Sequence, residues 1–107
     1  MTREAEILRK LRKKGWKFST ERSRKTFGRM NYDYKFVKVN PVGHTVATII
    51  HELIHVEHPK LPEGVVVALE MERRREITCK DEDEILHAFS PDLYRVLKQI
   101  QAIRGGL

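Results

Sequence analysis

The sequence predicts an α+β fold, in which a short antiparallel sheet packs on a central helix and additional helices complete the core. The chain of 107 residues has the size of one compact domain. Between positions 16 and 40, short runs of alternating apolar residues are typical of strands. Elsewhere, apolar residues recur at helical spacing. We therefore expect a single domain over residues 1–107.

The first expected element is a basic helix over about residues 3–14. Ala5, Leu8 and Leu11 form one apolar stripe, and lysine and arginine fill much of the remaining surface. Thr2 precedes the helix and is a suitable N-cap, because its hydroxyl can accept a hydrogen bond from a backbone N–H of the first turn.

Three short strands are expected next. Residues 16–18 alternate between apolar and charged side chains. The segments 26–32 and 35–40 read as the two antiparallel strands of a hairpin, with the turn near Asp33. Phe36 weakens the alternation of the second strand, so both of its faces are expected to be partly covered.

The remainder of the chain carries helical signals. The first of these helices is apolar almost all round, which is expected for a buried central helix. Proline marks the start of two others, where its missing N–H is tolerated. The expected helices are 46–57 with Thr45 as the cap, 63–75 after Pro62, 81–88, and 91–104 with Ser90 as the cap.

The charge is concentrated at the N-terminal end. The formal net charge is +6, and residues 1–40 hold thirteen Lys and Arg against four acids, so this part carries +9 and residues 41–107 carry −3. A basic N-terminal region predicts contact with nucleic acid or another anionic partner. The alternative is a solvated lysine-rich helix face.

Cysteine and hydropathy patterns exclude several classes of protein. Cys79 is the single cysteine, which rules out an intrachain disulfide and a CxxC zinc site. No segment approaches the roughly 18 apolar residues that a bilayer-spanning helix needs. No signal-peptide stretch follows Met1. We expect a cytoplasmic protein without a membrane partner.

The central helix contains the motif His51-Glu52-Leu53-Ile54-His55, which matches HExxH. Residues four apart on a helix lie about 6 Å from each other, so both imidazoles can point a nitrogen at one zinc ion, Zn2+. Glu52 is offset by roughly 100° and lies close to a metal-bound water, where a carboxylate acts as general base. The alternative is a pair of core histidines with hydrogen-bond partners.

A catalytic zinc ion needs a third protein ligand. The candidates are His58, Glu63, Glu70 and Glu72. His58 would place three ligands on one straight helix, with the third about 10 Å along the axis from the first. A following helix that folds back antiparallel would instead bring Glu63 or Glu70 against the two histidines.

The pattern resembles the zincin metallopeptidases, specifically the small gluzincin-like proteins of phages and prokaryotes and the SprT-like and ImmA/IrrE-like groups. The resemblance covers about Gly28 to Ala68: a hairpin that ends in a strand and Asn-Pro, the HExxH helix, a short turn with Pro59, and a second helix that opens with an acid. It implies a minimal zincin fold and zinc-dependent hydrolysis of peptide bonds in a peptide or protein substrate.

The resemblance also implies a ligand set. In these families the third ligand is commonly a Glu that opens a Glu-Ala-x-x-x-Ala segment, and Glu63-Gly64-Val65-Val66-Val67-Ala68 stands at that place. Glu63 is therefore the implied third ligand, although Gly64 departs from the pattern. Glu70 is the fallback.

A substrate-binding strand is implied as well. In the family, the strand before the motif helix is the sheet edge on which an extended peptide pairs, which here means Lys35, Phe36, Val37, Lys38 and Val39. The alternative is an edge whose lysines prevent another strand from pairing with it. For the whole chain, the alternative to a peptidase is a non-catalytic, zinc-stabilised module that binds nucleic acid or protein.

Overall fold

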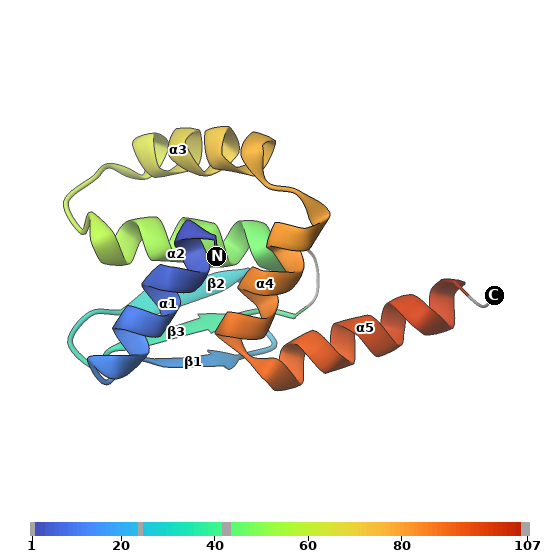
Figure 1. Ribbon diagram of the computed structural model, residues 1–107. Helices are drawn as coiled ribbons and strands as arrows, with labels where there is room; N and C mark the ends of the chain where they lie inside the picture. The colour runs from blue at the N-terminus through green and yellow to red at the C-terminus, as the bar shows by residue number, and fades with distance from the viewer. Residues whose placement is uncertain (1, 24, 42–43, 106–107) are drawn as a thin grey trace.

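The computed structural model describes residues 2–23, 25–41 and 44–105, and its architecture is α+β, as expected (Figure 1). Within these residues it contains five helices and one three-stranded sheet. The elements are α1 (Arg3–Lys13), β1 (Lys17–Thr20), β2 (Gly28–Asn31), β3 (Phe36–Val39), α2 (Thr45–Glu57), α3 (Glu63–Glu76), α4 (Cys79–Phe89) and α5 (Pro91–Gly105). No helix among them is long and apolar enough to cross a membrane.

The sheet is mixed, with the strand order β1-β3-β2. The prediction of an antiparallel hairpin is correct for β2 and β3, but β1 pairs with β3 in parallel, so a purely antiparallel sheet is wrong. After β1 the chain passes to the far side of the sheet for β2 and then returns to the middle. The aromatic ring of Phe18 on β1 packs 5.5 Å from that of Phe89, which ties β1 to α4.

The expectation that the strand before the motif helix is a sheet edge is wrong. Because β3 is the central strand, neighbours on both sides occupy its backbone groups. Val37 and Val39 are fully buried. Phe36, Val37, Lys38 and Val39 are therefore not at a sheet edge, and Lys35 precedes the strand and accepts a hydrogen bond from the Lys17 N–H. The open edges belong to β1 and β2.

The core lies between one face of the sheet and the helices. The valines of β3 meet Ile49 and Leu53 of α2, with Leu8 of α1, Ile85 and Phe89 of α4 in the same buried cluster. Helix α3 lies along the other side of α2 from the sheet, and α5 extends away from the body (Figure 1). Only Val66 of α3 is buried, so α3 is an outer layer over the motif helix.

Side-chain caps set several helix ends. The Thr2 hydroxyl accepts from the Ala5 N–H at 3.1 Å, as expected. Helix α4 begins at Cys79, before the expected start at residue 81, because Thr78 and Asp81 form a reciprocal capping box. The expectation that Thr45 caps α2 is wrong: Thr45 is the first helical residue and its hydroxyl donates to the Pro41 carbonyl.

Candidate metal centre

The structure brings the two motif histidines together on one side of α2. His51 and His55 lie one helical turn apart, and their Nε2 atoms are 3.2 Å from each other. Their side chains are 18% and 23% exposed, so both rings stand at the wall of a cleft rather than in the core. The spacing of the motif leads to two imidazole nitrogens that face the same point.

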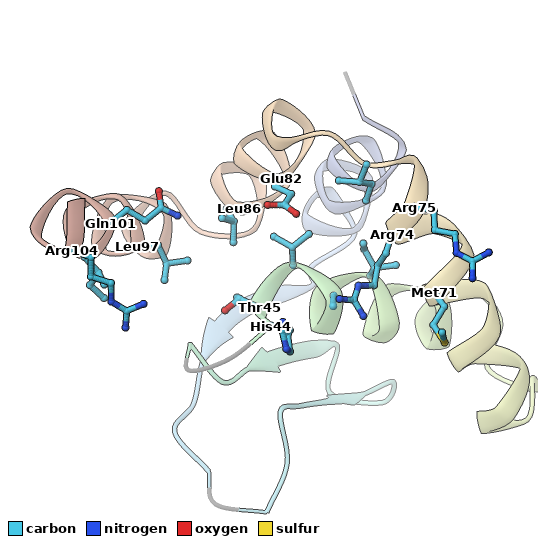
Figure 2. Close-up of a pocket in the computed structure, with 15 residues that line it drawn as sticks. His44, Thr45, Met71, Arg74, Arg75, Glu82, Leu86, Leu97, Gln101 and Arg104 are labelled. Carbon is cyan, nitrogen blue, oxygen red and sulfur yellow. The ribbon is translucent and has the colours of Figure 1, made fainter. Parts of the chain in front are cut away.

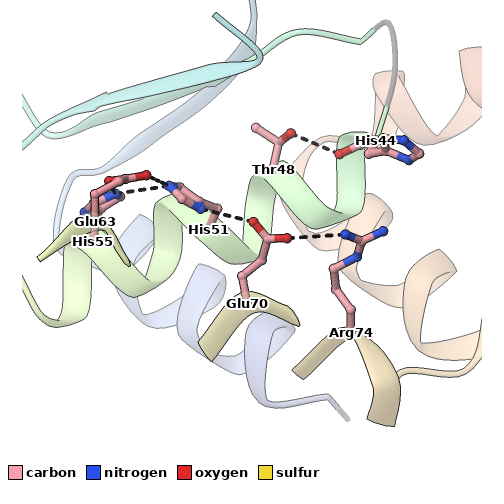
Figure 3. Close-up of polar contacts among 7 residues, drawn as sticks. All are labelled: His44, Thr48, His51, His55, Glu63, Glu70 and Arg74. Atoms are coloured by element: carbon pink, nitrogen blue, oxygen red, sulfur yellow. Dashed lines mark hydrogen bonds and ion pairs between the residues drawn. The ribbon is translucent and has the colours of Figure 1, made fainter. Parts of the chain in front are cut away.

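Glu63 faces the same point from the next helix. Its two carboxylate oxygens lie 2.7 Å from His51 Nε2 and 2.8 Å from His55 Nε2 (Figure 3). Glu63 can reach both rings because it is the first residue of α3, which follows a short turn and packs along α2. The side chain of Glu63 is 64% exposed, so the cluster is open to solvent on this side.

Glu70 occupies a different position from Glu63. Its Oε1 lies 3.1 Å from His51 Nδ1, the ring nitrogen that points away from the cluster, and its Oε2 lies 3.4 Å from Arg74 (Figure 3). Glu70 therefore orients the His51 ring rather than joining the ligand set. Such an outer carboxylate fixes the tautomer in which Nε2 carries the free lone pair.

The other two candidates lie elsewhere. His58 ends α2 and Glu72 faces away from the cluster, and both line a separate cavity of about 240 Å³ between α1, α2 and α3. Among the described residues, the grouping of metal-binding side chains is thus His51, His55 and Glu63, whose donor atoms all lie within 4.8 Å of one another.

Glu52 is buried beside this cluster. Desolvation raises the pKa of its carboxyl, the positive potential of His51 and His55 opposes that shift, and the nearby Glu63 carboxylate adds to it. Glu52 lines the same cleft as the histidines. A carboxylate whose pKa is raised holds a proton more readily, which suits a general base.

The cleft has a volume of about 690 Å³. Its floor is α2, one wall is β2 with Phe27 and Met30, and the other wall is α3 with Val67. Gly28 allows β2 to approach α2 closely: a Cβ at this position would lie 2.4 Å from Thr48 Cγ2 and 3.4 Å from Glu52 Cγ. Gly28 therefore determines how closely the cleft wall stands to the motif.

The donor set fits a zinc ion. Two imidazole nitrogens and one carboxylate, open to solvent on one side, are the three-ligand arrangement of many catalytic zinc sites. Zinc accepts both nitrogen and oxygen ligands, and the orienting carboxylate on His51 is a common support for it. The residues present thus suit this metal in type, number and openness.

Reasoning from sequence missed three residues of the site. Gly28 and Met30 on β2 line the cleft, and Arg74 lies four residues beyond Glu70 on α3. The i, i+4 spacing of Glu70 and Arg74 is a signal that the sequence contains. The strand order that places β2 beside the motif has no comparable local signal.

Comparison with known proteins gives no relative: no protein-family model matches the chain, and neither the curated proteins nor the solved structures contain a significant match.

Proposed function

We propose that this chain is a zinc-dependent metallopeptidase. The observation that carries the proposal is the convergence of His51 Nε2, His55 Nε2 and the Glu63 carboxylate from two helices, with the buried Glu52 carboxylate in the same cleft. Two ligands, a third ligand from the following helix and an adjacent base are the parts that zinc-dependent hydrolysis of an amide needs.

Each residue has a distinct role in this proposal. A bound zinc ion supplies Lewis acidity toward a carbonyl oxygen and a water molecule. His51, His55 and Glu63 hold the ion, and Glu70 keeps the His51 ring in the required orientation. Glu52 accepts a proton from the attacking water and then donates it to the leaving nitrogen of the cleaved peptide bond.

The substrate backbone has a natural place on β2. This strand is an edge of the sheet, it pairs with β3 on one side only, and it lines the cleft. An extended peptide that adds to this edge would run past the metal centre between β2 and α3. The pairing role that sequence reasoning gave to residues 35–39 thus passes to residues 28–31.

Glu52→Gln tests the proposal. The amide keeps the size of the side chain but cannot take up a proton, so we expect hydrolysis of an unstructured protein such as casein to fall by about 10²–10⁴-fold. Zinc binding should stay close to that of the wild type. Glu57→Gln, an exposed position at the end of the same helix, is the matched control and should retain activity.

An observation favours the second candidate, a zinc-stabilised module that binds nucleic acid. Lys10 and Lys13 of α1 and Lys17 of β1 are exposed, and within the described chain none of the three pairs with an acid. Affinity for DNA or RNA through these lysines should fall steeply as salt rises. Hydrolysis that depends on Glu52 distinguishes the peptidase from this module.

A further inference from the structure

A second cavity, of about 630 Å³, adjoins the metal cleft. It runs from the C-terminal half of α3, across the first turn of α2, to the far part of α5 (Figure 2). We call it the arginine groove, defined by Arg74, Arg75 and Arg104 and by the apolar side chains of Leu86 and Leu97 between them. Apart from Arg74, none of these defining residues lines the cleft of His51 and His55.

The groove and the cleft of His51 and His55 share part of their lining. His44, Ala47 and Arg74 line both. Arg74 is separated from His51 by one carboxylate, because Glu70 contacts Arg74 at 3.4 Å and His51 at 3.1 Å. His44, the N-cap residue of α2, also lines the groove and is seven residues from His51, which corresponds to about 10 Å along the helix. That distance equals about three residues of an extended peptide.

The charges on the groove favour an anion. Within the described residues, Arg75 and Arg104 make no hydrogen bond or ion pair, and Arg74 makes only the long contact with Glu70. Glu82 is the acid that lines the groove. The first turn of α2 adds partial positive charge, and its N-cap residue, His44, gives it no side-chain hydrogen bond. Three cationic side chains thus stand against two carboxylates, Glu82 on the groove and Glu70 beside Arg74.

The floor of the groove favours a peptide over other anions. Ile50 and Leu86 are buried beneath it, and Ile77 and Leu97 are half-buried. No Phe, Tyr or Trp is among its described lining residues, so the groove has no array of large rings on which successive nucleobases could stack, and His44 is the single aromatic ring among them. The chain's net charge of +6 also disfavours a second copy as the occupant. An acidic peptide segment with aliphatic side chains complements both the arginines of the groove and its apolar floor.

We propose that the arginine groove binds an acidic segment of the peptide substrate, with a carboxylate of that segment at Arg74, where the groove meets the cleft of His51 and His55. This names the substrate class of the proposed peptidase and rests on that function for the reaction. The binding step needs only the groove, so it can be measured without turnover.

The test is a binding assay with zinc-loaded Glu52→Gln protein, which should not cleave its ligand. Two fluorescein-labelled decapeptide pools are compared by anisotropy: one is rich in Asp, Glu and Leu, and the other has Asn and Gln in place of the acids. We expect the acidic pool to bind about fivefold more tightly, the strength of one or two exposed ion pairs. Arg74→Gln with Arg104→Gln should abolish the preference, and Glu82→Gln should increase it.

The control for general charge is Lys10→Gln with Lys13→Gln, which removes the same net charge from exposed positions on α1 and should retain the preference. Equal binding of the two pools overturns the proposal. A preference for the acidic pool that survives loss of both arginines also overturns it, and so does a preference that is lost equally in the lysine control. Tighter binding of an oligonucleotide through the same arginines, or a dimer that their loss dissociates, also overturns it. Absence of casein hydrolysis by the wild type counts against the proposed function alone.

Discussion

Gly28 provides a sharp test of how the fold positions the site. An alanine Cβ at this position would lie 2.4 Å from Thr48 Cγ2, which is 1.0 Å closer than the 3.4 Å at which ordinary contact begins. Thr48 is branched at Cβ, so its methyl group cannot rotate away freely. We expect Gly28→Ala to displace β2 from α2 and to lower the free energy of unfolding by about 1–3 kcal/mol.

The second variant identifies the cause. Thr48→Ser removes Cγ2 and leaves Lys38 O, at 3.3 Å, as the nearest atom to the new Cβ. Gly28→Ala in the Thr48→Ser background should therefore cost less than in the wild type, with a coupling free energy of about 0.5–3 kcal/mol in a double-mutant cycle. Urea unfolding followed by far-ultraviolet circular dichroism measures all four proteins. A Gly28→Ala protein as stable as the wild type, or a cycle without coupling, would refute the packing argument.

Three further predictions concern the cluster itself. Zinc at about 100 times its dissociation constant should raise the free energy of unfolding by about 2.7 kcal/mol, and EDTA should reverse this stabilisation. In thermal melts, the His55→Ala protein should not be stabilised by zinc. Glu70→Ala should weaken zinc binding by about 10–100-fold in a competition titration, while Glu72→Ala on the same helix leaves it unchanged. Burial raises the pKa of Glu52, so its carboxyl is harder to ionise in the folded chain than in the unfolded chain. The fold therefore loses stability as the pH rises above about 4, where the unfolded carboxyl ionises. In EDTA, Glu52→Gln should therefore be more stable than the wild type to urea at pH 7, and the difference should vanish near pH 4 or below.

Local signals in the sequence predicted much of the fold. The stripe of Ala5, Leu8 and Leu11 indicated α1, and the hydroxyls of Thr2 and Ser90 cap helices as expected. The hairpin of β2 and β3 follows from its turn. These features depend on neighbours within a few residues, which is why a single sequence is enough to find them.

The order of the strands could not be predicted in this way. Whether β1 or β2 lies beside the motif helix depends on contacts between distant residues, such as Phe18 with Phe89 and Gly28 with Thr48. Neither pair has a periodic or local pattern. The family resemblance placed the open edge on the strand before the motif, and the mixed topology moves that edge to β2.

The same distinction between local signals and long-range contacts applies to the residues of the site. Helical spacing placed His51 and His55 together, and a short turn put Glu63 within reach. The choice between Glu63 and Glu70 needed the structure, because it depends on which nitrogen of His51 each carboxylate meets. The link from Glu70 to Arg74, and from there to the arginine groove, has meaning only once α3 is packed on α2.

The measurement that tests the central claim most directly is a zinc titration of the purified, EDTA-treated protein by isothermal calorimetry, with elemental analysis of the dialysed product. We predict one zinc ion per chain, lost or greatly weakened in His51→Ala and Glu63→Ala and retained in Glu72→Ala. A wild-type protein that takes up no zinc, or a Glu63→Ala protein that binds it as tightly as the wild type, would contradict the account.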